Sequence, residues 1–357
     1  MKDVKQIDLQ EYGLDNSFIT QSIEYNGLYI ARIVSQEKNI YHAICENGEL
    51  FAEVSGKLRF EATIPSDFPA VGDFVMLDRC TGKNGNAIIH HVLHRKSLFM
   101  RKSAGNTNEE QVVAANMDIV FLCMSLNKDF NIHRLERYLS MTWESGAIPV
   151  VVLTKADLCN NLYRKLHAIN SVALGVDVVV TSTIELDGWQ QLSKYIKSGC
   201  TIALLGSSGV GKSSLINCML GEELLNTKQI RIDDDKGRHT TTRRELFLIS
   251  GGGIVIDTPG MRELGMWDVL EGLDKSFADI EAYLGKCRFR NCTHTSEPGC
   301  AIWEAIAQQE LSPKRWESYR KLKTEAVFAD DKRNYLAEKE KKFKNISKLN
   351  KKYFKNK

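Results

Sequence analysis

The chain has 357 residues, of which 43% are hydrophobic and 26% are charged, and its net charge is +3. These proportions are typical of a folded globular protein and exclude a disordered or collagen-like chain. At roughly 100–200 residues per domain, the length predicts two or three domains. No apolar run approaches the ~20 residues that span a bilayer, and the start MKDVKQIDLQ lacks a signal-peptide core, so we expect a soluble, cytoplasmic protein.

The positive charge is concentrated at one end of the chain. Residues 339–357 hold nine lysines and one acidic residue, a net charge of +8, which leaves −5 for the rest. A basic surface over the whole body is therefore not indicated. A lysine tail adds phosphate affinity that does not depend on sequence, although such a tail is often only a solvated end.

The first third of the chain has the pattern of a small β-barrel. Five short apolar or alternating segments are separated by turn signals such as Asn47-Gly48, and they are residues 28–34, 40–45, 50–54, 73–78 and 87–93. This number of strands favours the OB type, whose members commonly bind RNA. Another small barrel with a structural role is the alternative. The polar residues 101–111 predict a linker.

Beyond the linker, continuous apolar strands alternate with helical segments, which indicates a parallel sheet covered on both faces. These strands are predicted at residues 118–124, 148–154, 176–181, 200–206 and 253–258. A later helix begins at Ser312-Pro313 and carries an apolar stripe of Trp316, Tyr319 and Leu322. We expect three domains, which are residues 1–103 with the OB barrel, 104–274 with the α/β fold and 275–357 with a cysteine cluster, helices and the basic tail.

The segment 206–213 matches the phosphate-binding pattern G-x-x-x-x-G-K-[ST] between a predicted strand and a predicted helix. Backbone N–H groups of such a loop wrap phosphate oxygens, Lys212 brings charge to the β- and γ-phosphates, and Ser213 offers its hydroxyl to Mg²⁺. The predicted phosphate-binding residues are Gly206, Ser207, Ser208, Gly209, Val210, Gly211, Lys212, Ser213 and Ser214.

The base is predicted to be guanine because Thr154-Lys155-Ala156-Asp157 stands at the end of a strand. The carboxylate of Asp157 can accept both guanine N1–H and N2–H₂, a pairing that adenine cannot offer, and Lys155 would lie along the base and ribose. Ser182, after another strand, is a candidate for the loop behind the base, although small polar residues there are also typical of an ordinary turn.

Two further segments are candidates for sensing the γ-phosphate. Asp257, at the end of a strand, can hold Mg²⁺ through water, and the N–H of Gly260 can contact the γ-phosphate and lose it after hydrolysis. In the polar segment 236–243, Thr241 is our choice over Thr240 and Thr242 for Mg²⁺, with a solvated loop as the alternative.

The residue after Gly260 is Met261, where Ras-like enzymes place the glutamine that orients the attacking water. A thioether cannot do this, so His239 is the candidate, since a neutral imidazole can orient water or accept its proton near pH 7. The rival role for His239 is a contact with RNA or solvent. Slow intrinsic turnover and stimulation by a partner are predicted in either case.

Three cysteines and a histidine are clustered near the C-terminus, at Cys287, Cys292, His294 and Cys300. The chain has no secretory signal, and its count of nine cysteines is odd. A metal site is therefore favoured over a disulfide framework. Three thiolates and one imidazole complete a tetrahedral Zn²⁺ shell, which indicates a structural ion; the alternative is a group of buried cysteines. The adjacent basic trio suits RNA phosphates and comprises Lys286, Arg288 and Arg290.

The order of the motifs is unusual, because the base motif at 154–157 precedes the phosphate loop at 206–213. Ras-like GTPases have the opposite order, and a circular permutation reconciles the two with one spatial site. With the OB-like front, GSSGVGKS, GRHTTT, DTPG and the Cys/His cluster, residues 25–325 resemble the RsgA (YjeQ) family of circularly permuted GTPases. The resemblance implies the same four zinc ligands.

The resemblance also implies the function: a GTP hydrolase (an acid anhydride hydrolase) that binds the small (30S) ribosomal subunit and its rRNA as a late assembly checkpoint. We expect the protein to be monomeric. Ribosome-stimulated hydrolysis to GDP and phosphate would use Mg²⁺, beside one structural Zn²⁺. The alternatives are a permuted GTPase of the large subunit or another ribonucleoprotein, a P-loop kinase, which has no use for the base motif, and a nucleic-acid-binding module with a degenerate nucleotide site.

Overall fold

The computed structural model divides into two compact units, Met1–Gly265 and Met266–Lys357. The residues that it describes are 6–82, 85–102, 110–127, 129–184, 188–225, 244–257, 270–295 and 297–327. The lysine tail lies outside these ranges, and the three-domain division at residues 103 and 274 remains a prediction.

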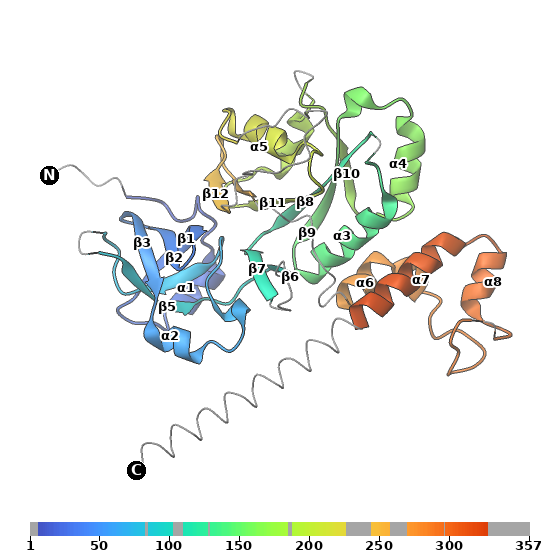
Figure 1. The fold of residues 1–357 in the computed structure, drawn as a ribbon, viewed down its shortest axis with the longest axis horizontal. Coiled ribbons are helices and arrows are strands. Elements are labelled where there is room, and N and C mark those ends of the chain that lie inside the picture. The colour runs from blue at the N-terminus through green and yellow to red at the C-terminus, as the bar shows by residue number, and fades with distance from the viewer. Residues whose placement is uncertain are drawn as a thin grey trace, which may run out of the picture. The chain divides into compact units, whose positions relative to one another are not determined.

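The described residues of the first unit include a barrel (Figure 1). It has five strands in the order β1-β2-β3-β5-β4 and is closed by β1–β4 pairing. The strands are β1 (Tyr29–Glu37), β2 (Ile40–Cys45), β3 (Gly48–Val54), β4 (Phe74–Leu77) and β5 (Ala87–Val92). Neighbours are antiparallel except β3 and β5. The side chains of Leu50, Ala52 and Val54 alternate into the core. The predicted strands and the OB-type barrel are confirmed.

Short helices cover the barrel, namely α1 (Asn16–Ser22), α2 (Gly56–Glu61) and the 3₁₀ turn η1 (Pro65–Asp67). Asp15 caps α1, since its carboxylate accepts from the N–H of Ser17 at 2.9 Å. The buried ring of Phe18 then packs on Phe74 with 4.4 Å between centroids. Part of the N-terminal extension therefore packs on the barrel, in a cluster with Phe74, Met76 and Leu93 that is separate from the core inside the barrel.

The predicted linker is wrong at both of its ends. A two-stranded sheet joins β6 (Leu98–Lys102) to β7 (Glu110–Ala115) in an antiparallel pair. The strand-forming signal lies in apolar residues that flank the polar stretch, and Phe99, Val113 and Ala115 are buried. Polarity alone therefore does not mark the boundary of the strands.

The second part of this unit is a mainly parallel sheet in the order β10-β9-β8-β11-β13-β12. In chain order the strands are β8 (Ile119–Ser125), β9 (Ile148–Thr154), β10 (Asp177–Val180), β11 (Thr201–Leu205), β12 (Glu245–Leu248) and β13 (Ile254–Asp257). The helices are α3 (Ile132–Glu144), α4 (Leu162–Asn170) and α5 (Lys212–Leu220), with 3₁₀ turns η2 (Ala156–Leu158) and η3 (Gln190–Tyr195). In Figure 1, α3 and α4 lie on one side of the sheet and α5 on the other, as expected for a parallel sheet.

A buried arginine joins the barrel to this sheet. Arg32 of β1 is 1% exposed and donates to the carbonyl oxygens of Tyr12, Gly72 (3.2 Å) and Asn116 (3.4 Å) and to Oγ1 of Thr201 (2.9 Å) at the start of β11. Burial lowers the pKa of Arg32 to about 10, so the guanidinium stays charged at neutral pH.

Arg32→Ala is therefore expected to reduce the free energy of unfolding by about 3 kcal/mol or more, because it leaves buried acceptors without a donor. Chemical denaturation followed by tryptophan fluorescence measures this change. Arg164→Ala, at an exposed position of α4, is the matched control and should behave like the parent chain. A loss below about 1 kcal/mol for Arg32→Ala would contradict the structural role of this network.

The described part of the second unit is helical around a cysteine-rich loop. Its elements are α6 (Leu270–Ser276), α7 (Ala278–Glu281), α8 (Ala301–Ala307) and a further helix over residues 313–327. The predicted helix start and the apolar stripe of Trp316, Tyr319 and Leu322 are confirmed, and all three side chains are buried.

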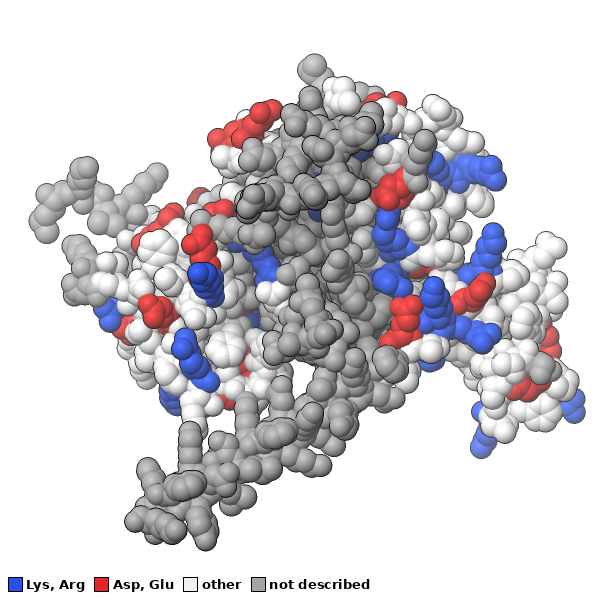
Figure 2. All heavy atoms as spheres, viewed as in Figure 1, with Lys and Arg blue, Asp and Glu red and all other residues white. Residues whose placement is uncertain are grey.

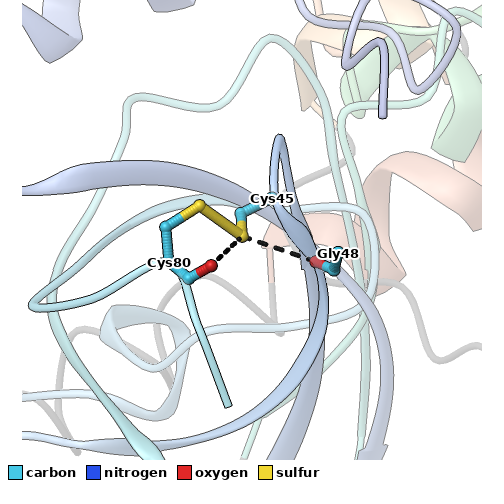
Figure 3. The surroundings of a disulfide bond; sticks show 3 residues. All are labelled: Cys45, Gly48 and Cys80. Atoms are coloured by element: carbon cyan, nitrogen blue, oxygen red, sulfur yellow. Dashed lines mark hydrogen bonds between the residues drawn. A yellow bond between two sulfur atoms is a disulfide. The ribbon is translucent and has the colours of Figure 1, made fainter. Parts of the chain in front are cut away.

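A disulfide bond joins Cys45, at the end of β2, to Cys80, just after β4 (Figure 3). Their Cα atoms are 6.0 Å apart, and Sγ of Cys45 lies 3.4 Å from the carbonyl oxygen of Gly48. The sequence analysis did not anticipate this pair, because closure of the barrel brings together strand ends that are 35 residues apart. The remaining cysteines, all described, are unpaired.

The charges of the described surface are mixed. On the face shown in Figure 2, basic and acidic side chains are interspersed, in agreement with the absence of a body-wide basic signal in the composition. Among the residues that the structure describes, no helix is long and apolar enough to cross a membrane.

Candidate functional site

Three predicted loops meet at the carboxyl ends of β9, β10 and β11, the edge of a parallel sheet where ligands bind. The hydroxyl of Thr154 donates to the carbonyl oxygen of Val210 at 2.5 Å, and Nζ of Lys155 donates to that of Gly209 at 2.5 Å. The base motif and the phosphate loop, more than 50 residues apart, are thus in direct contact.

The loop behind the predicted base also has its expected place. Oγ of Ser182 donates to Oδ1 of Asp157 at 2.8 Å, and the N–H of Ala156 donates to the carbonyl oxygen of Thr181 at 3.2 Å. Asp157 itself is exposed, so its carboxylate is oriented by Ser182 while it remains accessible to a ligand.

The phosphate loop runs from Gly206 to the first turn of α5, where Ser213 and Ser214 lie. A Cβ atom on Gly206 would lie 2.4 Å from the carbonyl oxygen of Cys123, so no other residue fits there. Gly209 and Gly211 have φ of 74° and 102°, the left-handed region that favours glycine. The ammonium of Lys212 donates to the carbonyl oxygens of Gly206 at 2.7 Å and of Ser207 at 2.9 Å. Ser208 is exposed and Val210 is buried.

The strand β13 ends at Asp257, beside the phosphate loop. Burial raises the pKa of Asp257 to about 6, the positive charge of Lys212 lowers it, and the negative charge of Glu245, its partner on β12, raises it further. The other predicted residues of the γ-phosphate region, which are His239, Thr241, Gly260 and Met261, lie outside the described residues.

One group at this site was missed by the sequence reasoning. Asp129 follows β8, the neighbour of β11, and accepts a hydrogen bond from Ser207 of the phosphate loop. The available signal was the polar run after the apolar strand, since the ends of parallel strands share an edge of the sheet.

The four residues of the cysteine cluster converge in the second unit. Nδ1 of His294 lies 3.4 Å from Sγ of Cys287, 3.6 Å from Sγ of Cys292 and 3.4 Å from Sγ of Cys300. All four donor atoms lie within 4.8 Å of one another. The backbone N–H of Ala301 also donates to Sγ of Cys287, at 3.4 Å.

This donor set fits a tetrahedral zinc ion. With Zn–S of about 2.3 Å and Zn–N of about 2.0–2.1 Å, tetrahedral geometry separates two sulfurs by about 3.8 Å and a sulfur from a nitrogen by about 3.6 Å. The Cys287–Cys300 sulfur distance is 4.0 Å. The predicted basic trio around the cluster is exposed and consists of Lys286, Arg288 and Arg290.

The base motif contacts the phosphate loop although it precedes that loop in the chain. Both lie on a mainly parallel sheet that follows an OB-type barrel in the sequence. This combination defines a circularly permuted GTPase. A sequence model of the RsgA GTPase family matches residues 92–267. Relatives covering most of the chain agree with this match, and the chain belongs to the RsgA GTPase family, a family of GTP-hydrolysing enzymes.

Two of these relatives and two solved structures define the likeness. The small ribosomal subunit biogenesis GTPases RsgA 2 of Lactiplantibacillus plantarum and RsgA 1 of Listeria innocua are 46% and 43% identical, each over 90% of both chains. YjeQ from Thermotoga maritima is 28% identical, with a TM-score of 0.62 over 84% of this chain and 99% of its own. YloQ, a circularly permuted GTPase, is 24% identical with a TM-score of 0.58 over 84% and 96%, and shares the fold.

Proposed function

We propose that this protein hydrolyses GTP at the phosphate loop and acts on the small ribosomal subunit as a late assembly checkpoint. The observation that carries the proposal is the contact of the base motif with the phosphate loop, through Thr154–Val210 and Lys155–Gly209. The partner is inferred from relatives that are named small ribosomal subunit biogenesis GTPases.

In this proposal each part of the site has one role. Asp157, oriented by Ser182, accepts from the guanine edge, and the N–H groups of the loop hold the phosphates. Lys212 leaves its carbonyl partners for the β- and γ-phosphates, which offer a full negative charge in place of two dipoles. Ser213, Asp257 and, as a sequence-based prediction, Thr241 would hold Mg²⁺, which would neutralise charge on the β- and γ-phosphates.

The reaction is attack of water on the γ-phosphorus. The new P–O bond forms as the bond to the β,γ-bridging oxygen breaks, giving GDP and inorganic phosphate, and the proton of the water goes to His239 or to phosphate. His239 as the water-orienting group and Gly260 as the γ-phosphate sensor remain sequence-based predictions. Relaxation of these contacts after hydrolysis would release the protein from the subunit.

Hydrolysis is expected to require more Mg²⁺ as the pH falls below about 6. The pKa of Asp257 is raised to about 6 by burial, so the carboxylate that would hold Mg²⁺ becomes protonated below that pH. The apparent Mg²⁺ affinity should then fall by about fivefold between pH 6 and pH 5 and change little above pH 7. Mg²⁺ titrations of GTP hydrolysis between pH 5 and 8 measure this change in Mg²⁺ affinity. The control is Asp257→Asn, which lacks the titrating carboxylate and keeps only the pH dependence of the nucleotide. An identical pH profile in both proteins would contradict this role of Asp257.

For the metal centre we propose one structural Zn²⁺ held by Cys287, Cys292, His294 and Cys300, which holds together a segment too rich in loops to fold on its own core. The exposed basic trio beside it and the OB-type barrel are the proposed rRNA-binding surfaces. A ribosome-bound role also implies a cytoplasmic location, and we propose that the protein acts as a monomer.

The partner is tested by co-sedimentation. Purified protein with a non-hydrolysable GTP analogue should pellet with small subunits, while GDP or large subunits should leave it in the supernatant. Binding to large subunits alone, or binding that ignores the nucleotide, would contradict the proposed partner. A Lys212→Ala variant, which cannot hold the γ-phosphate, should fail to respond to the GTP analogue.

A further inference from the structure

A carboxylate outside all of the nucleotide motifs is bonded to the phosphate loop. Oδ2 of Asp129 accepts a hydrogen bond from Oγ of Ser207 at 2.5 Å. Ser207 is the first residue after Gly206, and its own carbonyl oxygen accepts from Lys212 at 2.9 Å. Ser207 is therefore held through both its side chain and its backbone.

Asp129 has a fixed orientation of its own. Its N–H donates to Oδ1 of Asn127 at 2.9 Å. The guanidinium of Arg134, in the first turn of α3, donates to Oδ1 at 3.1 Å and to Oδ2 at 2.8 Å, and also to the carbonyl oxygen of Asp129. Asn131 caps the same turn by accepting from the N–H of Arg134 at 3.0 Å. The chain of contacts thus connects Ser207 to the end of a helix packed on the sheet.

The charge of the pair is balanced. Partial burial raises the pKa of Asp129, but the hydrogen bonds from Ser207 and Arg134 and the charges of Arg134 and Lys155 outweigh it and hold the pKa below its usual range. A lone carboxylate beside a phosphate site would repel the ligand, whereas a carboxylate paired with an arginine presents little net charge.

A glycine-containing loop that binds phosphate must be ordered, and fixing its backbone costs conformational entropy. A loop already fixed before the nucleotide arrives avoids part of this cost. We propose that Asp129 is a positioning residue, which holds Ser207 through a hydrogen bond and so shapes the phosphate loop for the nucleotide. This inference rests on the proposed role of the loop in binding GTP.

The test compares Ser207→Ala, Ser207→Thr, Asp129→Ala and the double variant Ser207→Ala/Asp129→Ala. Dissociation constants for GDP and for a non-hydrolysable GTP analogue are measured by fluorescence, with KM and kcat for GTP. Loss of one charge-assisted hydrogen bond should weaken both nucleotides and raise KM by about 5–20-fold, with kcat unchanged. Ser207→Thr keeps the hydroxyl and should behave like the parent chain.

The double variant separates positioning from a direct contact of the serine hydroxyl with phosphate. If the hydroxyl acts through Asp129, the double variant is no weaker than either single variant, because both remove the same bond. Asp177→Asn is the matched control. Asp177 lies at the start of β10, and its carboxylate also accepts from a hydroxyl, that of Tyr195 at 2.5 Å, and pairs with a cation, Lys194. It should leave KM unchanged.

The inference would be overturned if Asp129→Ala bound nucleotide with the same affinity as the parent chain or more tightly. Additive losses of affinity in the double variant would also overturn it, and so would a fall in kcat with KM unchanged. Melting without nucleotide shows that each variant is folded. If Asp129→Ala is not folded, Asp129→Asn, which removes the charge that strengthens the bond to Ser207, replaces it in both the single and the double variant. If the parent chain bound neither GDP nor the GTP analogue, the proposed function would fail and the inference with it. Normal binding by the parent chain and by Ser207→Ala would remove the inference alone.

Discussion

Asp157→Asn should weaken GTP binding by about 100-fold or more and shift the preference to xanthosine triphosphate. The carboxylate accepts two hydrogen bonds from guanine, each worth about 1.5–3 kcal/mol when the acceptor is charged. Asparagine can accept only one of them. Xanthine carries a carbonyl oxygen in place of the guanine amino group, so the new amide N–H₂ has an acceptor.

Competition binding with GTP, ATP and xanthosine triphosphate measures this shift. Asparagine keeps the oxygen that accepts from Ser182, so the loop should remain in place. Asp177→Asn, at the opposite end of the neighbouring strand β10, serves as the control for the same chemical change. Unaltered GTP affinity in Asp157→Asn would show that another group recognises the base.

Cys300→Ser should lose most of the bound zinc and unfold the loop from Cys287 to Cys300. Structural zinc sites supply about 10–16 kcal/mol of apparent binding free energy, which is also folding free energy, so an incomplete ligand set removes a large stabilising contribution. Metal analysis and hydrogen exchange of the second unit measure the two effects. GTP binding should persist, because the phosphate loop lies in the first unit.

Cys218→Ser is the matched control, since Cys218 is an unpaired cysteine of α5 outside the cluster. It should retain one zinc ion per chain. A parent chain that contains no zinc as purified and takes up none would contradict the proposed metal centre, whatever the variants do.

Much of the fold could be predicted from sequence because its signals are local. Alternation and turn residues marked β1 to β5, and continuous apolar runs marked β8 to β11 and β13. The phosphate loop and base motif were recognisable from residue spacing, and a circular permutation made their reversed order compatible with one site. The contacts of Thr154 and Lys155 with the loop now show that meeting.

What could not be predicted depends on contacts between distant residues. The Cys45–Cys80 pair and the bonds of Arg32 follow from closure and packing of the barrel. Asp129 belongs to no motif, and only the adjacency of β8 and β11 brings it to Ser207. The strands β6 and β7 were missed because polar residues between them resemble a linker.

The most direct test of the account is hydrolysis of GTP and of ATP by the purified protein, alone and with small or large ribosomal subunits. We expect slow hydrolysis that is selective for GTP and that rises strongly with small subunits only. Activity that prefers ATP would contradict the role of Asp157, and GTP hydrolysis indifferent to small subunits would contradict the proposed partner.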